Sequence, residues 1–170
     1  MTAPLAGETV RASHYPKVRV IKKSAVESVT SSIVMQNDDD LTVALDAGKT
    51  YWIQLFAGMG GATAGDIRVD WATTGGVAQL TARHCQGPGV SVTDVQDTGT
   101  RNAIHDLGTD VLYGTDNIRS GSFTESFLVE TTTANAAGTL TLRWAQSGSN
   151  ATATTVSPSS FMVVTEIDLA

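Results

Sequence analysis

The chain has 170 residues and a formal net charge of −6 at pH 7, a size that suits one domain able to bury its own core without disulfides or metals. Only 16% of its residues are charged, against about 25% in typical soluble domains, and the single cysteine, Cys85, excludes an intramolecular disulfide. No apolar run approaches the roughly 20 residues of a membrane helix, and an acidic chain is repelled by nucleic acid. We therefore expect neither a membrane nor a nucleic acid as partner.

The charge is divided unevenly along the chain. Residues 1–23 carry one acid and five bases, Arg11, Lys17, Arg19, Lys22 and Lys23, whereas acids outnumber bases in the rest of the sequence. Prolines and a glycine in this leader argue against a long regular element. We expect residues 1–23 to form an extended attachment arm that grips an acidic partner through these bases and Tyr15. Residues 24–170 would form the folded domain.

From Ser24 onward the hydrophobic pattern has a period of two, which predicts strands. The β-branched stretch 26–35 is expected to be a strand, and the polar stretch 36–40 a turn. Leu41, Val43 and Leu45 alternate with polar residues and predict a half-buried strand. Residues 50–57 are apolar at nearly every position, which predicts a central strand covered on both faces.

A glycine-rich connection over 58–65 leads to a predicted strand in which Ile67, Val69 and Trp71 point one way. A further strand is expected over 77–84. The stretch 86–121 is rich in glycine, and we expect it to hold two short strands, near 90–95 and 104–113, on long loops.

The C-terminal part predicts two strands, 122–130 and 138–146, that pair across a turn. Leu140, Leu142 and Trp144 of the second strand should face the core. A polar loop over 147–158 precedes a last strand over 160–167. No window shows a helical period, so the sequence predicts an all-β fold. Eight to ten short strands with long crossing loops indicate an antiparallel β-sandwich, jelly-roll-like, with an extended N-terminal arm.

The sequence offers no catalytic or metal-binding constellation, and we expect a protein that is not an enzyme and uses no cofactor. His14, His84 and His105 lie in unrelated contexts, and adjacent residues of a strand, such as His84 and Cys85, point to opposite faces. The run Asp38–Asp40 could bind calcium, but a structural turn is the simpler interpretation. A glycan hydrolase would need a pair of carboxylates at a set separation, and none stands out.

The three tryptophans divide into two groups. Trp71 and Trp144 are in phase with core residues, which predicts core packing. Trp52 and Phe56 lie on the face opposite Tyr51, Ile53 and Leu55, so one two-layer core cannot bury both sets. Gln54 lies on the same face as Trp52 and Phe56. We therefore predict that Trp52 and Phe56 form a subunit interface.

Two parts of the sequence resemble a known group of proteins. The opening stretch 4–16 resembles the N-termini of small virion proteins of tailed bacteriophages that infect high-GC Gram-positive bacteria. The pattern of residues 39–51, 138–146 and 159–167 is similar to β-sandwich domains of phage head-decoration and minor tail proteins. The closing strand pair also resembles that of trimeric TNF/C1q-type jelly rolls.

This resemblance implies a virion structural protein, assembled in the host cytoplasm, that forms homo-oligomers, commonly trimers. The leading hypothesis is a capsid decoration protein on the outer surface of the head, where it binds the major capsid protein and cements it. The alternative is a minor tail or fibre-tip protein that binds a tail protein and the host surface, with the loops of residues 86–121 as its recognition face.

Overall fold

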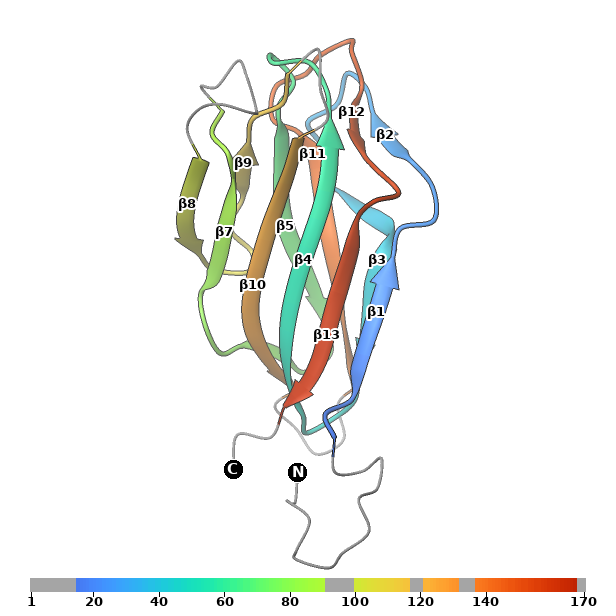
Figure 1. The fold of residues 1–170 in the computed structure, drawn as a ribbon, viewed down its shortest axis with the longest axis vertical. Helices are drawn as coiled ribbons and strands as arrows, with labels where there is room; N and C mark the ends of the chain where they lie inside the picture. The colour runs from blue at the N-terminus through green and yellow to red at the C-terminus, as the bar shows by residue number, and fades with distance from the viewer. Residues whose placement is uncertain (1–14, 91–99, 117–120, 132–136, 168–170) are drawn as a thin grey trace, which may run out of the picture.

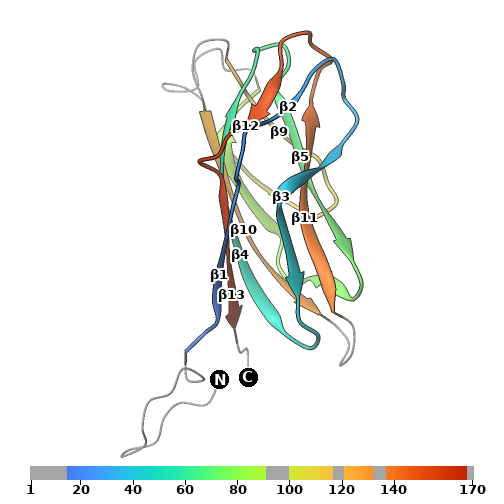
Figure 2. The same cartoon turned by 90° about the vertical axis from the view of Figure 1, so that its right-hand side faces the viewer.

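The computed structural model describes residues 15–90, 100–116, 121–131 and 137–167. They form two antiparallel sheets packed face to face, which confirms the predicted all-β sandwich (Figure 1, Figure 2). The larger sheet has the order β1 (Val18–Lys22), β13 (Phe161–Ile167), β4 (Thr50–Gly60), β10 (Gly121–Thr131), β7 (Arg83–Pro88), β8 (Thr100–His105). The smaller sheet has the order β3 (Gln36–Leu45), β11 (Gly138–Gln146), β5 (Ile67–Thr74), β9 (Val111–Tyr113). The short strands β2 (Glu27–Val29), β6 (Val77–Gln79) and β12 (Thr154–Val156) join the larger sheet.

Eight of these strands have jelly-roll topology, as the long crossing loops predicted. Counted along the chain as β1, β3, β4, β5, β9, β10, β11 and β13, the first pairs with the last, the second with the seventh, the third with the sixth and the fourth with the fifth. A chain that pairs in this way is one long hairpin rolled into two sheets. Among the described residues, no helix is long and apolar enough to cross a bilayer.

The core lies between the sheets and follows the period of two. In β4, Tyr51, Ile53 and Leu55 point inward and are almost fully buried. In the opposite sheet, the predicted core residues are also buried, namely Trp71, Leu140, Leu142 and Trp144. Burial of each large apolar side chain contributes about 1.5–3 kcal/mol, so this alternation is what holds the sheets together.

The folded domain begins before residue 23, the predicted boundary between arm and domain. Strand β1 pairs with β13 over its whole length, from Val18 opposite Thr165 to Lys22 opposite Phe161. Residues 18–23 therefore belong to the sandwich, because the last strand of a jelly roll needs the first as its neighbour. Residues 1–14 of the predicted arm lie outside the described residues.

The acidic run 38–40 is part of a strand and not a turn. β3 begins at Gln36 and pairs with β11, with a register shift between Thr141 and Arg143. The carboxylate of Asp38 accepts hydrogen bonds from the backbone N–H groups of Asp40 and Leu41. These bonds accommodate the irregularity within the ladder, which composition alone did not indicate.

Further strand assignments differ from the sequence-based expectation. The strands predicted over 122–130 and 138–146 exist as β10 and β11, but they lie in opposite sheets and do not pair with each other. The stretch 77–84 is divided between β6 and β7, and 26–35 contains only the short β2. In 86–121 the described strands are the end of β7, β8 and β9, and most of the predicted strand at 90–95 lies outside the described residues.

Candidate functional site: the outer face of the larger sheet

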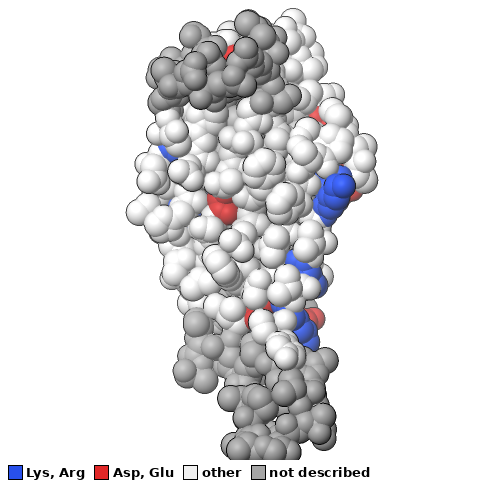
Figure 3. Space-filling view, in the orientation of Figure 1, with Lys and Arg blue, Asp and Glu red and all other residues white. Residues whose placement is uncertain are grey.

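The outer face of the larger sheet exposes apolar side chains. Val18, Val20, Trp52, Ile104 and Phe161 have exposed fractions of 55%, 64%, 42%, 62% and 38%. In Figure 3 this face is nearly free of charged atoms over β13, β4 and β10, whereas bases gather along the edge where β1 lies. A large apolar face on a small domain is typical of a binding surface.

Strand register arranges the outward side chains in rows across the sheet. One row contains Phe161, Phe56, Thr124, Gln86 and Asn102, from β13 to β8. The next row contains Val163, Gln54, Ser126, His84 and Ile104. A third contains Thr165, Trp52 and Leu128. Outward residues of neighbouring strands at one register lie side by side, so each row is a continuous strip of surface.

A groove of about 500 Å³ lies over the first two rows. The middle of the groove is hollow because β10 contributes only two short side chains there, Thr124 and Ser126. Phe56 and Phe161 border the groove on one side, and His84 and Gln86 border it on the other. The rings of Phe56 and Phe161 stack with centroids 5.6 Å apart and planes inclined by 24°. The groove therefore has one aromatic wall and one polar wall, which carries the His84 imidazole and the Gln86 amide.

A buried polar cluster supports the floor of this groove. The carboxylate of Glu125 accepts hydrogen bonds from Trp71 Nε1 at 2.7 Å and from the Tyr113 hydroxyl at 2.8 Å, and it lies 3.2 Å from Arg83 Nε. Burial raises the pKa of Glu125, and the nearby Arg83 guanidinium opposes that shift. The acid side chain points away from the groove into the core, where its acceptor oxygens are satisfied.

The predicted attachment bases do not act alike in the structure. Lys17, Lys22 and Tyr15 are exposed, and Lys17 lies 3.5 Å from Glu166. Arg19 turns inward, where it donates to the carbonyl of Ala44 at 2.7 Å and covers the ring of Tyr51. Arg11 lies outside the described residues.

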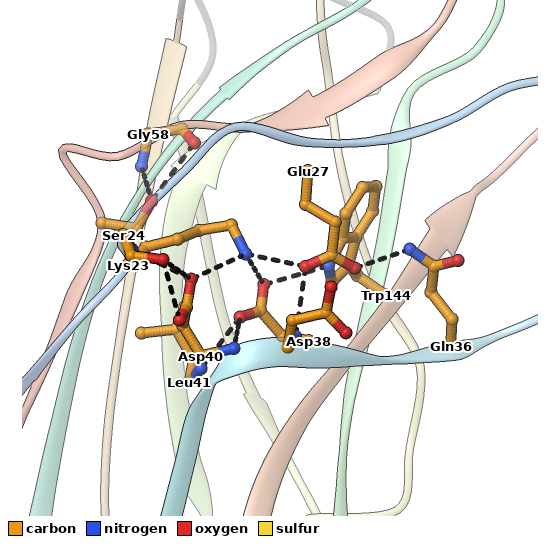
Figure 4. A network of polar contacts seen from close by, with 11 residues as sticks. Lys23, Ser24, Glu27, Gln36, Asp38, Asp40, Leu41, Gly58 and Trp144 are labelled. Carbon is orange, nitrogen blue, oxygen red and sulfur yellow. Dashed lines mark hydrogen bonds and ion pairs between the residues drawn. The ribbon is translucent and has the colours of Figure 1, made fainter.

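Lys23 cannot contact a partner, which corrects its predicted role in attachment. Its side chain is buried, and its Nζ donates to Glu27 at 2.7 Å and to Asp38 at 2.9 Å (Figure 4). Trp144 Nε1 donates to the same Asp38 oxygen at 3.2 Å. Burial by itself lowers the pKa of Lys23, but the hydrogen bonds to Glu27 and Asp38 outweigh it and raise the pKa above its usual value. This ion cluster fastens the end of β1 to β3.

Two of the three acids considered for calcium, Asp38 and Asp40, are occupied by this network, whereas Asp39 is exposed. Asp38 bonds Lys23, and Asp40 accepts a hydrogen bond from the backbone N–H of Ser24 at 2.9 Å, which lowers the pKa of Asp40. No cluster of His, Cys, Asp and Glu able to hold a metal occurs in the described ranges. His84 is exposed while Cys85 is buried, as the strand period predicted, and burial raises the pKa of the Cys85 thiol.

Trp52 and Phe56 both lie on the outer face, as predicted, but in different surroundings. Trp52 is in the third row, where Thr165 of β13 lies between it and Val18 of β1, whereas Phe56 stacks on Phe161 in the groove. The sequence did not single out Gln54, Gln86, Asn102 or Phe161. Alternation placed Gln54 on this face, but the row depends on pairings between strands far apart in the chain.

Comparisons with known proteins give a distant likeness. No protein-family model matches the sequence, and no curated protein matches it. Among solved structures, the fold is similar to the tripod from the baseplate of bacteriophage Tuc2009, with a TM-score of 0.38 and 12% identity over 98% of this chain and 72% of that chain. A likeness at this level does not carry function from one protein to the other, since one fold serves many functions.

Proposed function

We propose that the protein is a structural component of a phage virion that acts by binding, as a decoration protein on the outer surface of the capsid. The observation that carries the proposal is the nearly uncharged outer face of the larger sheet, with its exposed apolar side chains and its basic edge at β1. A surface of this kind favours contact with other proteins over solvent. The resemblance of residues 4–16 to phage virion proteins adds independent support.

In this proposal the segment before β1 attaches the domain to the major capsid protein. Lys17, directly before β1, and Lys22, at the end of β1, project into solvent, where they can meet an acidic partner surface. Many copies bound at once gain from avidity, so each contact can be modest while the shell as a whole is strengthened.

We also propose that the protein forms a homo-oligomer. A trimer is the form that the resemblance to phage virion proteins implies. The apolar corner formed by Val18, Val20 and Trp52 is the contact that we assign to it. These side chains lie on adjacent rows of one face, so a second copy can cover them together.

The test is incorporation of a truncated chain into particles. Removal of residues 1–14 leaves β1 and the Lys23 cluster in place, so the domain should stay folded but should be lost from virions. Quantitative proteomics of purified virions should find hundreds of copies of the intact protein per particle. A handful of copies would favour the tail alternative, and full incorporation of the truncated chain would show that the segment does not attach the domain.

A further inference from the structure

We propose that the groove over β13, β4, β10, β7 and β8 binds a neutral carbohydrate. In this assignment sugar rings stack on Phe56 and Phe161, and their hydroxyl groups bond the side-chain amides of Gln54, Gln86 and Asn102. The groove belongs to the folded domain, so the assignment does not depend on where the protein sits in a particle.

The shape of the groove suits a small part of a glycan chain. Its volume of about 500 Å³ lies within the roughly 300–1,000 Å³ of small-molecule sites. The concavity arises from the row pattern, since Thr124 and Ser126 are short side chains between taller ones on β4 and β7. It is open to solvent along the sheet face, so a longer chain could continue past its ends.

The hydrogen-bonding groups of the groove are available to a ligand. The side chains of Gln54, Gln86, Asn102, Thr124 and Ser126 line it, and none of them bonds another described residue through its side chain. Amides and hydroxyls can each donate and accept. Sugar hydroxyls have the same dual capacity, so a saccharide can pair several of these groups at once.

The aromatic wall supplies the apolar part of the contact. Phe56 and Phe161 form one partly exposed surface, because their rings stack at 5.6 Å. The C–H groups on one side of a sugar ring form a flat apolar patch that packs against such rings. An aromatic surface beside several amides that no described residue pairs is the combination that a neutral saccharide needs.

The residues that line the groove fit a neutral ligand better than an acidic one. Among its described lining residues there is no Lys or Arg, the groups that bind carboxylates and phosphates most strongly. Its one carboxylate, Glu125, is directed into the core and paired with Arg83, and both side chains are fully buried. This lining therefore favours a neutral ligand.

A second copy of the chain fits this groove less well than it fits the apolar corner. An apolar partner would bury the amides of Gln54, Gln86 and Asn102 without hydrogen bonds, which is costly. The corner of Val18, Val20 and Trp52 has no such amides. A subunit contact at the corner leaves the groove free. We therefore assign Phe56 to the ligand site and no longer to the predicted subunit interface.

The experiment is calorimetric titration of the full-length protein with neutral hexasaccharides of glucose, mannose, galactose and xylose, with hexagalacturonate as the acidic comparison. We expect at least one neutral hexasaccharide to bind. Gln86→Ala and Phe56→Ala should each weaken binding about tenfold, as expected for loss of a hydrogen bond or a stacking contact. Thr124→Tyr should abolish binding by filling the groove from an exposed position that the core does not use.

The matched control is Thr73→Tyr, which adds the same bulk at an exposed position of the other sheet and should leave affinity unchanged. Three results would overturn the assignment: no heat with any neutral hexasaccharide at millimolar concentration, tighter binding of hexagalacturonate, or binding that survives Thr124→Tyr. Dissociation of an oligomer by Thr124→Tyr would also overturn it, by showing that a second copy covers the groove. Virion incorporation is a separate measurement. A protein that fails to enter virions could still bind saccharide in calorimetry, so the two proposals are tested independently.

Discussion

At the scale of single residues, burial decides whether a charged side chain can contact a partner or forms an internal ion pair. Lys22 and Lys23 are neighbours in the sequence and both belong to the basic leader, yet one side chain is exposed and the other is buried. Strand period decides between them, because Lys22 points outward in β1 and the next residue points toward β3. A basic cluster in a sequence therefore contains both surface charges and internal ion pairs.

Substitution Lys23→Met should destabilise the protein by about 3–5 kcal/mol, because it leaves Asp38 buried without its cation. Urea unfolding at pH 8 measures this difference. The matched control Lys22→Met, at an exposed position of the same strand, should change the free energy of unfolding by no more than about 0.5 kcal/mol. Equal effects of the two substitutions would contradict the role assigned to the cluster.

The same cluster has a defined pH dependence. The pKa of Lys23 is raised above its usual value of 10.5 in the folded protein, so the folded state binds this proton more tightly than the unfolded state. Its contribution is complete below the unfolded pKa and is lost as pH rises through the folded pKa. The stability difference between the wild type and Lys23→Met should therefore narrow above pH 10.5 and stay constant from pH 7 to 9.

At the scale of elements, β1 shows how pairing partners far apart in sequence define the domain. β1 has only five residues, but it covers the free edge of β13 and closes the jelly roll. Its outward valines give no sequence sign of this role, because alternating valine and base also suits an extended arm.

Removal of residues 1–22 should be far more damaging than removal of residues 1–14. The longer deletion takes away every pairing of β1 with β13 and separates Lys23 from its strand, so thermal unfolding should shift to lower temperature or the chain should aggregate through the exposed edge. The shorter deletion should unfold at the temperature of the intact chain. Equal melting temperatures for the two deletions would show that β1 is dispensable to the domain.

At the scale of the whole molecule, the two sheets differ in what they offer to partners. The larger sheet exposes the apolar corner and the groove on one face, and its β1 edge is basic (Figure 3). Since these surfaces lie side by side and use different side chains, one copy can contact another copy and a ligand at the same time.

Substitution Trp52→Asp should convert the proposed oligomer into monomers, because a charge in the centre of an apolar contact is left without a partner. Sedimentation at micromolar concentration measures the mass directly. Trp52 is 42% exposed in the single chain, so the folded monomer should tolerate the change. The control Asn102→Asp places the same charge on the same face at β8, outside the corner, and should leave the oligomer intact. A wild-type monomer with Trp52 open to a fluorescence quencher would refute the oligomer.

Sequence alone was sufficient for the fold class and for much of the core. The period of two identified β4, β5, β11 and β13 and placed Trp71 and Trp144 inside, because alternation is a local property of a strand. It also separated Trp52 and Phe56 from the buried set of β4. The same reasoning assigned the acidic run 38–40 to a turn, since it could not see that Lys23 would neutralise Asp38.

Tertiary structure alone decided which strands are neighbours, and with them the groove. Phe56, Thr124, Gln86 and Asn102 form one row only because β4, β10, β7 and β8 pair in a particular order and register. Such pairings join segments far apart along the chain, and their free energy comes from burying both sheets together and not from any local pattern. The sequence by itself thus determined which face of each strand is apolar, whereas the packing of the jelly roll determined which residues share a surface.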